Sequence, residues 1–149
     1  MDARRAARSP RSLSLLAGII VVLAACTGTP QAEGDPGLVV TLNDFRIETG
    51  KSTVSEGPLV VQVDNHAPAT HEFVVVRTDL PAYQLPIGSD GLSVDEEAVD
   101  VVDEISEIDI GTSRTLELNL APGHYVFFCN LEGHYMAGMH EDLEVTAGA

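Results

Sequence analysis

Residues 127–139 read Phe-Phe-Cys-Asn-Leu-Glu-Gly-His-Tyr-Met-Ala-Gly-Met and decide the interpretation of this 149-residue chain. The segment places Cys129, His134 and Met139 at even spacing, with four residues between each pair. A thiolate, an imidazole and a thioether suit copper, whose trigonal sites use two His, one Cys and a weak axial Met. The segment thus supplies three of four such ligands, and a second His has to come from elsewhere.

Three histidines upstream are candidates for the second imidazole: His66, His71 and His124. His71 begins a strongly apolar segment after a turn, so its side chain can lie at a strand end, as the Cys does. His66 lies within the turn, where solvation explains it better. His124 is at the opposite end of the Cys strand, roughly 15 Å away at the rise of a β-strand. His140 directly follows the last Met and is expected to point away from it.

The first 25 residues have the pattern of an export signal. Four Arg precede an apolar run, residues 12–25, that has the length of a secretory h-region and is short for a membrane span. The run ends Leu-Ala-Ala-Cys26, which resembles the lipobox of bacterial lipoproteins, where the signal is cut before the Cys and the thiol is lipidated. We therefore expect an exported protein, lipid-anchored to the cell envelope at Cys26 and facing outside the cytoplasm. The alternative is an ordinary secretory signal.

Cysteine usage supports a metal site. The chain contains two Cys in an export context, where disulfides are permitted. If Cys26 carries lipid, Cys129 has no intramolecular partner and is prone to oxidation. Metal binding or burial would protect this thiol, and the neighbouring His and Met favour metal binding.

The remaining sequence divides into a tether and one domain. Residues 26–37 are rich in Gly, Pro and small polar residues and are interpreted as a flexible tether, which leaves 38–149 as the domain. Only one of the 23 acidic residues precedes Cys26, whereas four of the eight basic residues do, so the mature part has a formal net charge of −18. This charge argues against nucleic acid. It is compatible with a basic protein partner, and solubility explains it equally well.

The domain is predicted to be all-β. Several short strands separated by turns favour a Greek-key β-sandwich or barrel. Residues 79–100 are predicted to form one short helical or irregular insertion, and 101–108 could be helix or strand, of which we favour strand. The other predicted strands are rich in β-branched residues or alternate between apolar and polar positions: 39–47, 59–63, 71–77, 115–120, 124–129 and 142–146.

With these features in place, the chain resembles the cupredoxins, the small blue-copper proteins that include plastocyanin and azurin. The resemblance rests on residues 65–73, Asn-His-Ala-Pro-Ala-Thr-His-Glu-Phe, and on 125–139, and it covers about 38–145. The wide Cys–His spacing is nearer to that of rusticyanin and sulfocyanin. The resemblance implies one copper ion with three equatorial ligands and one axial ligand: His71, Cys129, His134 and, axially, Met139.

The resemblance also assigns roles around the ligands. Asn65, Glu72 and Asn130 are expected to surround the ligands without binding the metal. Many members have Asn or Ser where this chain has Glu72. A carboxylate near copper stabilises Cu(II), so Glu72→Gln is predicted to raise the midpoint potential. Met136 is a rival axial ligand, but it follows His134 too closely to return to the metal.

The predicted function is single-electron transfer between envelope redox partners by a type 1 copper site, without enzymatic chemistry. The resemblance implies that the edge of His134 reaches the surface, within an apolar rim of Tyr135, Met136 and Ala137. The partner is expected to be a cytochrome or a terminal oxidase or reductase, docked weakly, and the protein to be a monomer.

Two alternatives remain open. One is copper storage, delivery or resistance at the envelope, and the other is an accessory subunit of an envelope reductase or oxidase. A structural zinc site would show more Cys or His. A multicopper oxidase needs His-x-His pairs, and the chain has no hydrolase constellation.

Overall fold

The computed structural model describes residues 36–148. The predicted export signal, the lipidation of Cys26 and nearly all of the predicted tether therefore lie outside the described residues. Within them, two 3₁₀ turns, η1 (Ala82–Gln84) and η2 (Glu96–Ala98), accompany these strands: β1 (Leu38–Asn43), β2 (Arg46–Thr49), β3 (Thr53–Ser55), β4 (Gly57–Asn65), β5 (His71–Arg77), β6 (Asp100–Ile108), β7 (Ser113–Leu120), β8 (Gly123–Phe128) and β9 (His140–Thr146).

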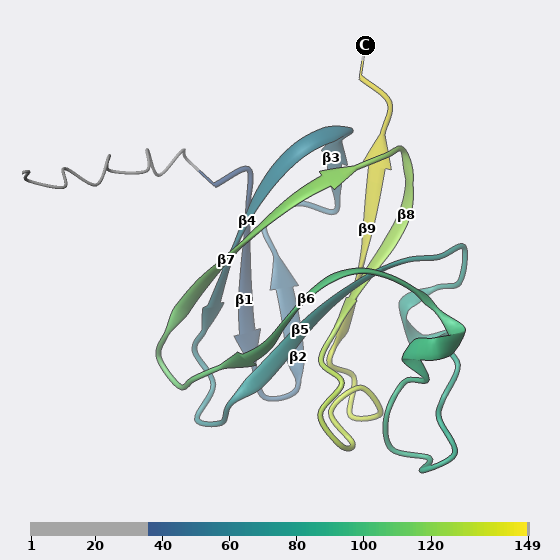
Figure 1. Ribbon diagram of the computed structural model, residues 1–149. Helices are drawn as coiled ribbons and strands as arrows, with labels where there is room; N and C mark the ends of the chain where they lie inside the picture. The colour runs from purple at the N-terminus through teal and green to yellow at the C-terminus, as the bar shows by residue number, and fades with distance from the viewer. Residues whose placement is uncertain (1–35, 149) are drawn as a thin grey trace, which may run out of the picture. The chain divides into compact units, whose positions relative to one another are not determined.

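The strands form two mixed sheets that face each other (Figure 1). One sheet has the order β2-β1-β4-β7, with β1 and β4 parallel, and the other has the order β3-β9-β8-β5-β6, with β3 and β9 parallel. All other pairs are antiparallel, including β5 with β8. The predicted all-β sandwich is therefore confirmed.

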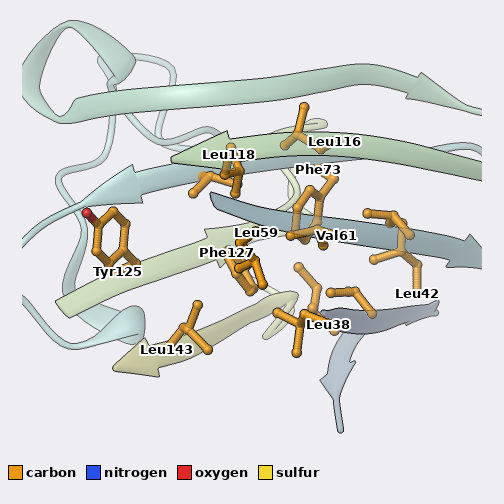
Figure 2. Packing of buried hydrophobic residues seen from close by; sticks show 14 of the residues in the cluster. Leu38, Leu42, Leu59, Val61, Phe73, Leu116, Leu118, Tyr125, Phe127 and Leu143 are labelled. Atoms are coloured by element: carbon orange, nitrogen blue, oxygen red, sulfur yellow. The ribbon is translucent and has the colours of Figure 1, made fainter. Parts of the chain in front are cut away.

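Alternation along the strands explains how the sheets pack. In β7, Leu116, Leu118 and Leu120 are buried and the residues between them are exposed, as expected for a strand with one solvated face. Figure 2 shows that side chains of both sheets, such as Leu118 and Phe127, point into one shared interior. Burial of each such side chain stabilises the fold by about 1.5–3 kcal/mol.

Strands β5 and β8 are buried on both faces. Phe73 and Phe127 point into the interior between the sheets, whereas Val74 and Phe128 belong to a second cluster on the outer face of the same sheet. The insertion at residues 79–100 covers this face and contributes Ala82, Leu85 and Val94 to it. Burial on both faces explains why these two strands read as continuous apolar runs.

Most expected elements are confirmed, and one is wrong. The insertion consists of the two 3₁₀ turns and irregular chain, and residues 101–108 belong to a strand. The expected single strand at 39–47 is instead a hairpin, because the chain turns at Asp44-Phe45 and Asn43 pairs with Arg46. Among residues 36–148, no helix is both long and apolar enough to cross a membrane.

Candidate metal centre

The three predicted equatorial ligands come together at one end of the sandwich. His71 is the first residue of β5, and Cys129 directly follows the last residue of β8. Because β5 and β8 are antiparallel neighbours, the start of one strand lies beside the end of the other. His134 lies in the loop that returns to β9, at the lower end of the molecule in Figure 1.

Three ligand atoms of these residues form a compact triangle. The Nδ1 atoms of His71 and His134 are 3.2 Å apart, and the Cys129 Sγ atom lies 3.9 Å and 3.4 Å from them, respectively. A point equidistant from the three atoms lies about 2.0 Å from each, close to the metal–ligand distances of transition-metal sites in proteins. His71 and Cys129 are fully buried, and His134 is partly buried. The triangle therefore fits one metal ion.

Met139 lies beside this triangle through its backbone. The Cys129 N–H donates to the Met139 carbonyl at 3.1 Å, and the Met139 N–H donates to the His134 carbonyl at the same distance. The Met139 side chain is fully buried in the core cluster that contains Cys129. Met136, the rival axial ligand, is 58% exposed. The structure therefore favours Met139 over Met136.

The ligand loop is a compact series of turns. The Ala137 N–H donates to the carbonyls of Gly133 and His134, and the β8–β9 pair Phe128–His140 closes the loop at its base. Gly133 has a φ of +80°, where a β-carbon would introduce strain. This closure brings His134 back toward Cys129.

The electrostatics of the site follow from burial. Burial raises the pKa of the Cys129 thiol, and the N–H groups of Glu72 and Leu131 act in the opposite direction. The Glu72 N–H donates to the sulfur at 3.3 Å. Burial also lowers the pKa of His134, as does neighbouring His71, which favours the neutral imidazole that a metal requires.

Asn65 holds the loop that leads into His71. Its side chain is fully buried and donates to the carbonyls of Ala69 and Ile108, at 2.8 Å and 2.9 Å. Its oxygen accepts from the Ala67 N–H at 2.9 Å. Asn65 thus ties the turn before His71 to the end of β6, the strand that pairs with β5, without touching the ligand triangle.

Asn130 connects the ligand loop to the insertion. Its oxygen accepts from the Val94 N–H at 2.7 Å, and its amide group donates to the Val94 carbonyl and to Glu96. The carboxyl groups of Glu72, Glu96 and Glu104 lie within 4.8 Å of one another. Burial, and then the charges of Glu96 and Glu104, raise the pKa of Glu72 to about 7. The Glu72 backbone therefore contacts the sulfur while its carboxyl group belongs to this acidic cluster.

The β1–β2 turn contributes two residues that the sequence did not predict. The Asp44 Oδ1 atom lies 3.0 Å from the Nε2 atom of His71. The Phe45 ring packs edge-on against the His134 ring, with centroids 4.9 Å apart. The adjacent polar pair Asn43-Asp44 is a turn signal that could have indicated this hairpin.

The expected apolar rim is partly wrong. Tyr135 is 4% exposed and points into the second core cluster, where its hydroxyl donates to the Ala82 carbonyl and accepts from the Leu85 N–H. Met136 and Ala137 are exposed as expected. Tyr135 points inward because the outer face of β8, covered by the insertion, offers its ring an apolar site and its hydroxyl two backbone partners.

The remaining histidines lie outside the ligand triangle. His66 is exposed in the turn before β5. His124 is the second residue of β8, at the end far from Cys129, and hydrogen-bonds the Thr78 carbonyl and Asp142. His140 packs against the Tyr135 ring, with centroids 5.2 Å apart.

Together, fold and site define a class of protein: a β-sandwich with a cluster of two His, one Cys and a buried Met that is suited to one metal ion. No protein-family model matches the chain, and no curated protein matches it. Solved structures do. Auracyanin of Roseiflexus castenholzii, in its dithionite-reduced form, is 22% identical over 72% of this chain and 94% of its own, with a TM-score of 0.55.

Two further structures agree. Rusticyanin of Thiobacillus ferrooxidans is 16% identical over 73% of this chain and 75% of its own, with a TM-score of 0.53. Azurin iso-2 of Methylomonas sp. strain J is 17% identical over 72% and 95%, with a TM-score of 0.50. These proteins are cupredoxins, and the chain has the cupredoxin fold. Its cluster of His71, Cys129, His134 and Met139 is suited to one copper ion.

Proposed function

We propose that this chain is an exported mononuclear copper protein that carries single electrons between redox partners of the cell envelope. The observation that carries the proposal is the triangle of His71 Nδ1, His134 Nδ1 and Cys129 Sγ, with Met139 buried beside it. This donor set is the trigonal one of blue-copper electron-transfer sites. When bound, the copper ion supplies a one-electron couple.

The chain's own residues favour electron transfer because they hold the ligands in fixed places. His71 lies in β5, whose approach is fixed by Asn65, and Cys129 receives the Glu72 N–H. Asn130 ties the ligand loop to the insertion. Ligands that cannot rearrange suit both oxidation states of a metal, which keeps the reorganisation accompanying electron exchange small.

The route to a partner leads through His134. This residue is the partly exposed member of the triangle. The exposed Phe45 packs against its ring, and the exposed Met136 follows it by two positions in the sequence. A weakly docked redox protein would reach the copper through this surface. The partner we propose is a cytochrome or a terminal oxidase or reductase, and the net charge of the mature part is compatible with a basic docking surface on it.

The location is proposed from the N-terminal sequence. The apolar run and the sequence Leu-Ala-Ala-Cys26 support export and lipid attachment at that Cys. Metabolic labelling with a radioactive fatty acid tests this directly. Label should enter the native chain and be absent from Cys26→Ser. Equal labelling of the two chains contradicts the anchor.

The optical spectrum of the full-length chain loaded with Cu(II) tests the copper site. We expect an intense thiolate-to-copper charge-transfer band, retained in Cys26→Ser and lost in Cys129→Ser. A colourless Cu(II) complex of the native chain contradicts the proposed site. Cys26→Ser is the matched control, because it also removes one thiol, but from a position outside the predicted domain.

Electron transfer is separated from copper storage by a redox titration. A carrier should cycle reversibly between Cu(I) and Cu(II) without losing the metal, at one ion per chain. Release of copper on each reduction, or binding of several ions per chain, indicates storage or delivery. In the described residues, one cluster combines Cys and His as ligands, which favours a single ion.

A further inference from the structure

We propose that Asp44 is a positioning residue that orients His71, strengthens it as a copper ligand and thereby lowers the midpoint potential of the site. The inference deepens the proposed function, because it concerns the same copper site. It rests on the contact between the β1–β2 turn and the first ligand of the site, which are 27 positions apart in the sequence.

The contact gives the two ring nitrogens of His71 different roles. Its Nε2 atom lies 3.0 Å from the Asp44 carboxylate, and its Nδ1 atom faces Cys129 and His134. A carboxylate only accepts hydrogen bonds, so Nε2 must carry a proton to make this bond. In the neutral ring, Nδ1 is then unprotonated and its lone pair points toward the metal position. Asp44 thus selects the tautomer that binds metal.

The charge of Asp44 acts through this hydrogen bond. The His71 side chain is 0% exposed, so water does not compete for Nε2, whereas the Asp44 side chain is 33% exposed and keeps its solvation in part. Among the described residues, Asp44 is the hydrogen-bond partner of Nε2. A carboxylate that accepts from a ligating imidazole makes that ligand more basic.

The more basic ligand distinguishes the two oxidation states. Cu(II) carries the higher charge and gains more from a strongly donating nitrogen than Cu(I) does. Outer partners of this kind typically change metal affinity by about 10–100-fold. If a tenfold loss falls on Cu(II) alone, the midpoint potential rises by about 59 mV, the value of a tenfold change for a one-electron couple.

Asp44→Asn separates charge from geometry. The amide oxygen can still accept from Nε2, so the ring stays in place while the negative charge is lost. Glu48→Gln is the matched control, because it removes the same charge from the same hairpin, where Glu48 is exposed and pairs with Arg46 rather than with a ligand. Asp44→Ala removes both charge and acceptor.

Two measurements on the full-length chain decide the proposal. The first is the midpoint potential of the copper-loaded chain by voltammetry. In Asp44→Asn we expect the affinity for Cu(II) to fall about tenfold relative to that for Cu(I), which raises the midpoint potential by about 59 mV. In Glu48→Gln we expect a much smaller rise of the potential. Equal shifts in the two variants overturn the proposal, because a general charge effect would then suffice.

The second measurement needs no metal. Long-range proton–nitrogen NMR correlations of the metal-free chain, recorded at alkaline pH, report which ring nitrogen of His71 carries the proton. We expect Nε2 in the native chain and a mixture of tautomers in Asp44→Ala. A proton on Nδ1 in the native chain overturns the proposal. If the copper-loaded native chain lacks the thiolate-to-copper charge-transfer band, the proposed function is refuted. The tautomer of His71 in the metal-free chain still tests the role of Asp44 in that case.

Discussion

Replacing Tyr135 by Phe should destabilise the fold by detaching the insertion from the ligand loop. The hydroxyl donates to the Ala82 carbonyl at 2.7 Å and accepts from the Leu85 N–H at 2.9 Å, and both bonds are buried. Tyr135→Phe keeps the ring in the second core cluster and removes both bonds. Two backbone groups are then left without a partner away from water.

The size of the effect follows from those two bonds. A typical intramolecular hydrogen bond contributes about 1 kcal/mol net, and a buried group left unpaired costs about 1–3 kcal/mol. We expect Tyr135→Phe to lower the free energy of unfolding by about 2 kcal/mol. For a domain of this size, that corresponds to a fall in Tm of about 8 °C.

The assay is guanidinium denaturation of the metal-free chain, so that copper release does not contribute. The chain has no Trp, and unfolding is therefore followed by far-UV circular dichroism. Two variants calibrate the result. Tyr83→Phe alters a 67% exposed residue and should change stability little, whereas Tyr125→Phe loses one bond, to the Ala121 carbonyl, and should cost about 1 kcal/mol. If Tyr135→Phe costs no more than Tyr83→Phe, the insertion does not depend on this hydroxyl.

Three further changes test other parts of the site. Asn65→Ala removes three hydrogen bonds at the entry to His71, so it should cost about 3 kcal/mol of unfolding free energy and weaken copper binding in a competition titration; unchanged affinity contradicts its role. Phe45→Ala uncovers one edge of His134 and should speed copper removal by a chelator in stopped-flow measurements, with little loss of stability; an unaltered rate refutes shielding. Because the pKa of Glu72 is raised from 4.5 to about 7 in the fold, the folded metal-free chain binds a proton that the unfolded chain has lost, and stability should fall as pH rises from about 4.5 to about 7. Glu72→Gln should flatten that dependence in urea titrations, and an unchanged slope would assign it to other groups.

Glu72 also bears on the midpoint potential of the copper site. Burial is the main cause of the raised pKa of the Cys129 thiol, and the charge of Glu72 adds to it. Glu72→Gln is therefore still predicted to raise the midpoint potential. Voltammetry of this variant beside Asp44→Asn compares a charge on the sulfur side with one on the imidazole side. An unchanged potential in Glu72→Gln would show that solvent screens the charge of Glu72 from the sulfur.

The sequence predicted those features that depend on short-range pattern. Residues 71–77 are β5 as expected, and the alternation of 115–120 appears as the half-buried β7. The spacing of Cys129, His134 and Met139 needed a strand end and a compact loop, both of which are local properties. His71 could be chosen among the histidines because a strand start and a strand end meet when neighbours run antiparallel.

The contacts that the sequence did not predict join distant segments. The hairpin at Asp44-Phe45 was hidden in a run of strand-forming residues, and the position of its tip beside two ligands depends on how the sheets pack. The inward orientation of Tyr135 depends on the insertion, whose irregular chain has no periodicity to read. Both differences depend on which segment packs against which in the folded chain, and amino-acid composition carries no information about that.

The ligands are consequently held from two sides. On one side, the β1–β2 turn contacts His71 through Asp44 and His134 through Phe45. On the other, the insertion is hydrogen-bonded to the ligand loop through Asn130 and Tyr135. A movement of either imidazole on a change of copper charge would have to disturb packed or hydrogen-bonded groups on both sides. Because close-packed protein interiors resist small displacements, the same contacts that stabilise the fold also favour a ligand set that would stay fixed during the proposed electron exchange.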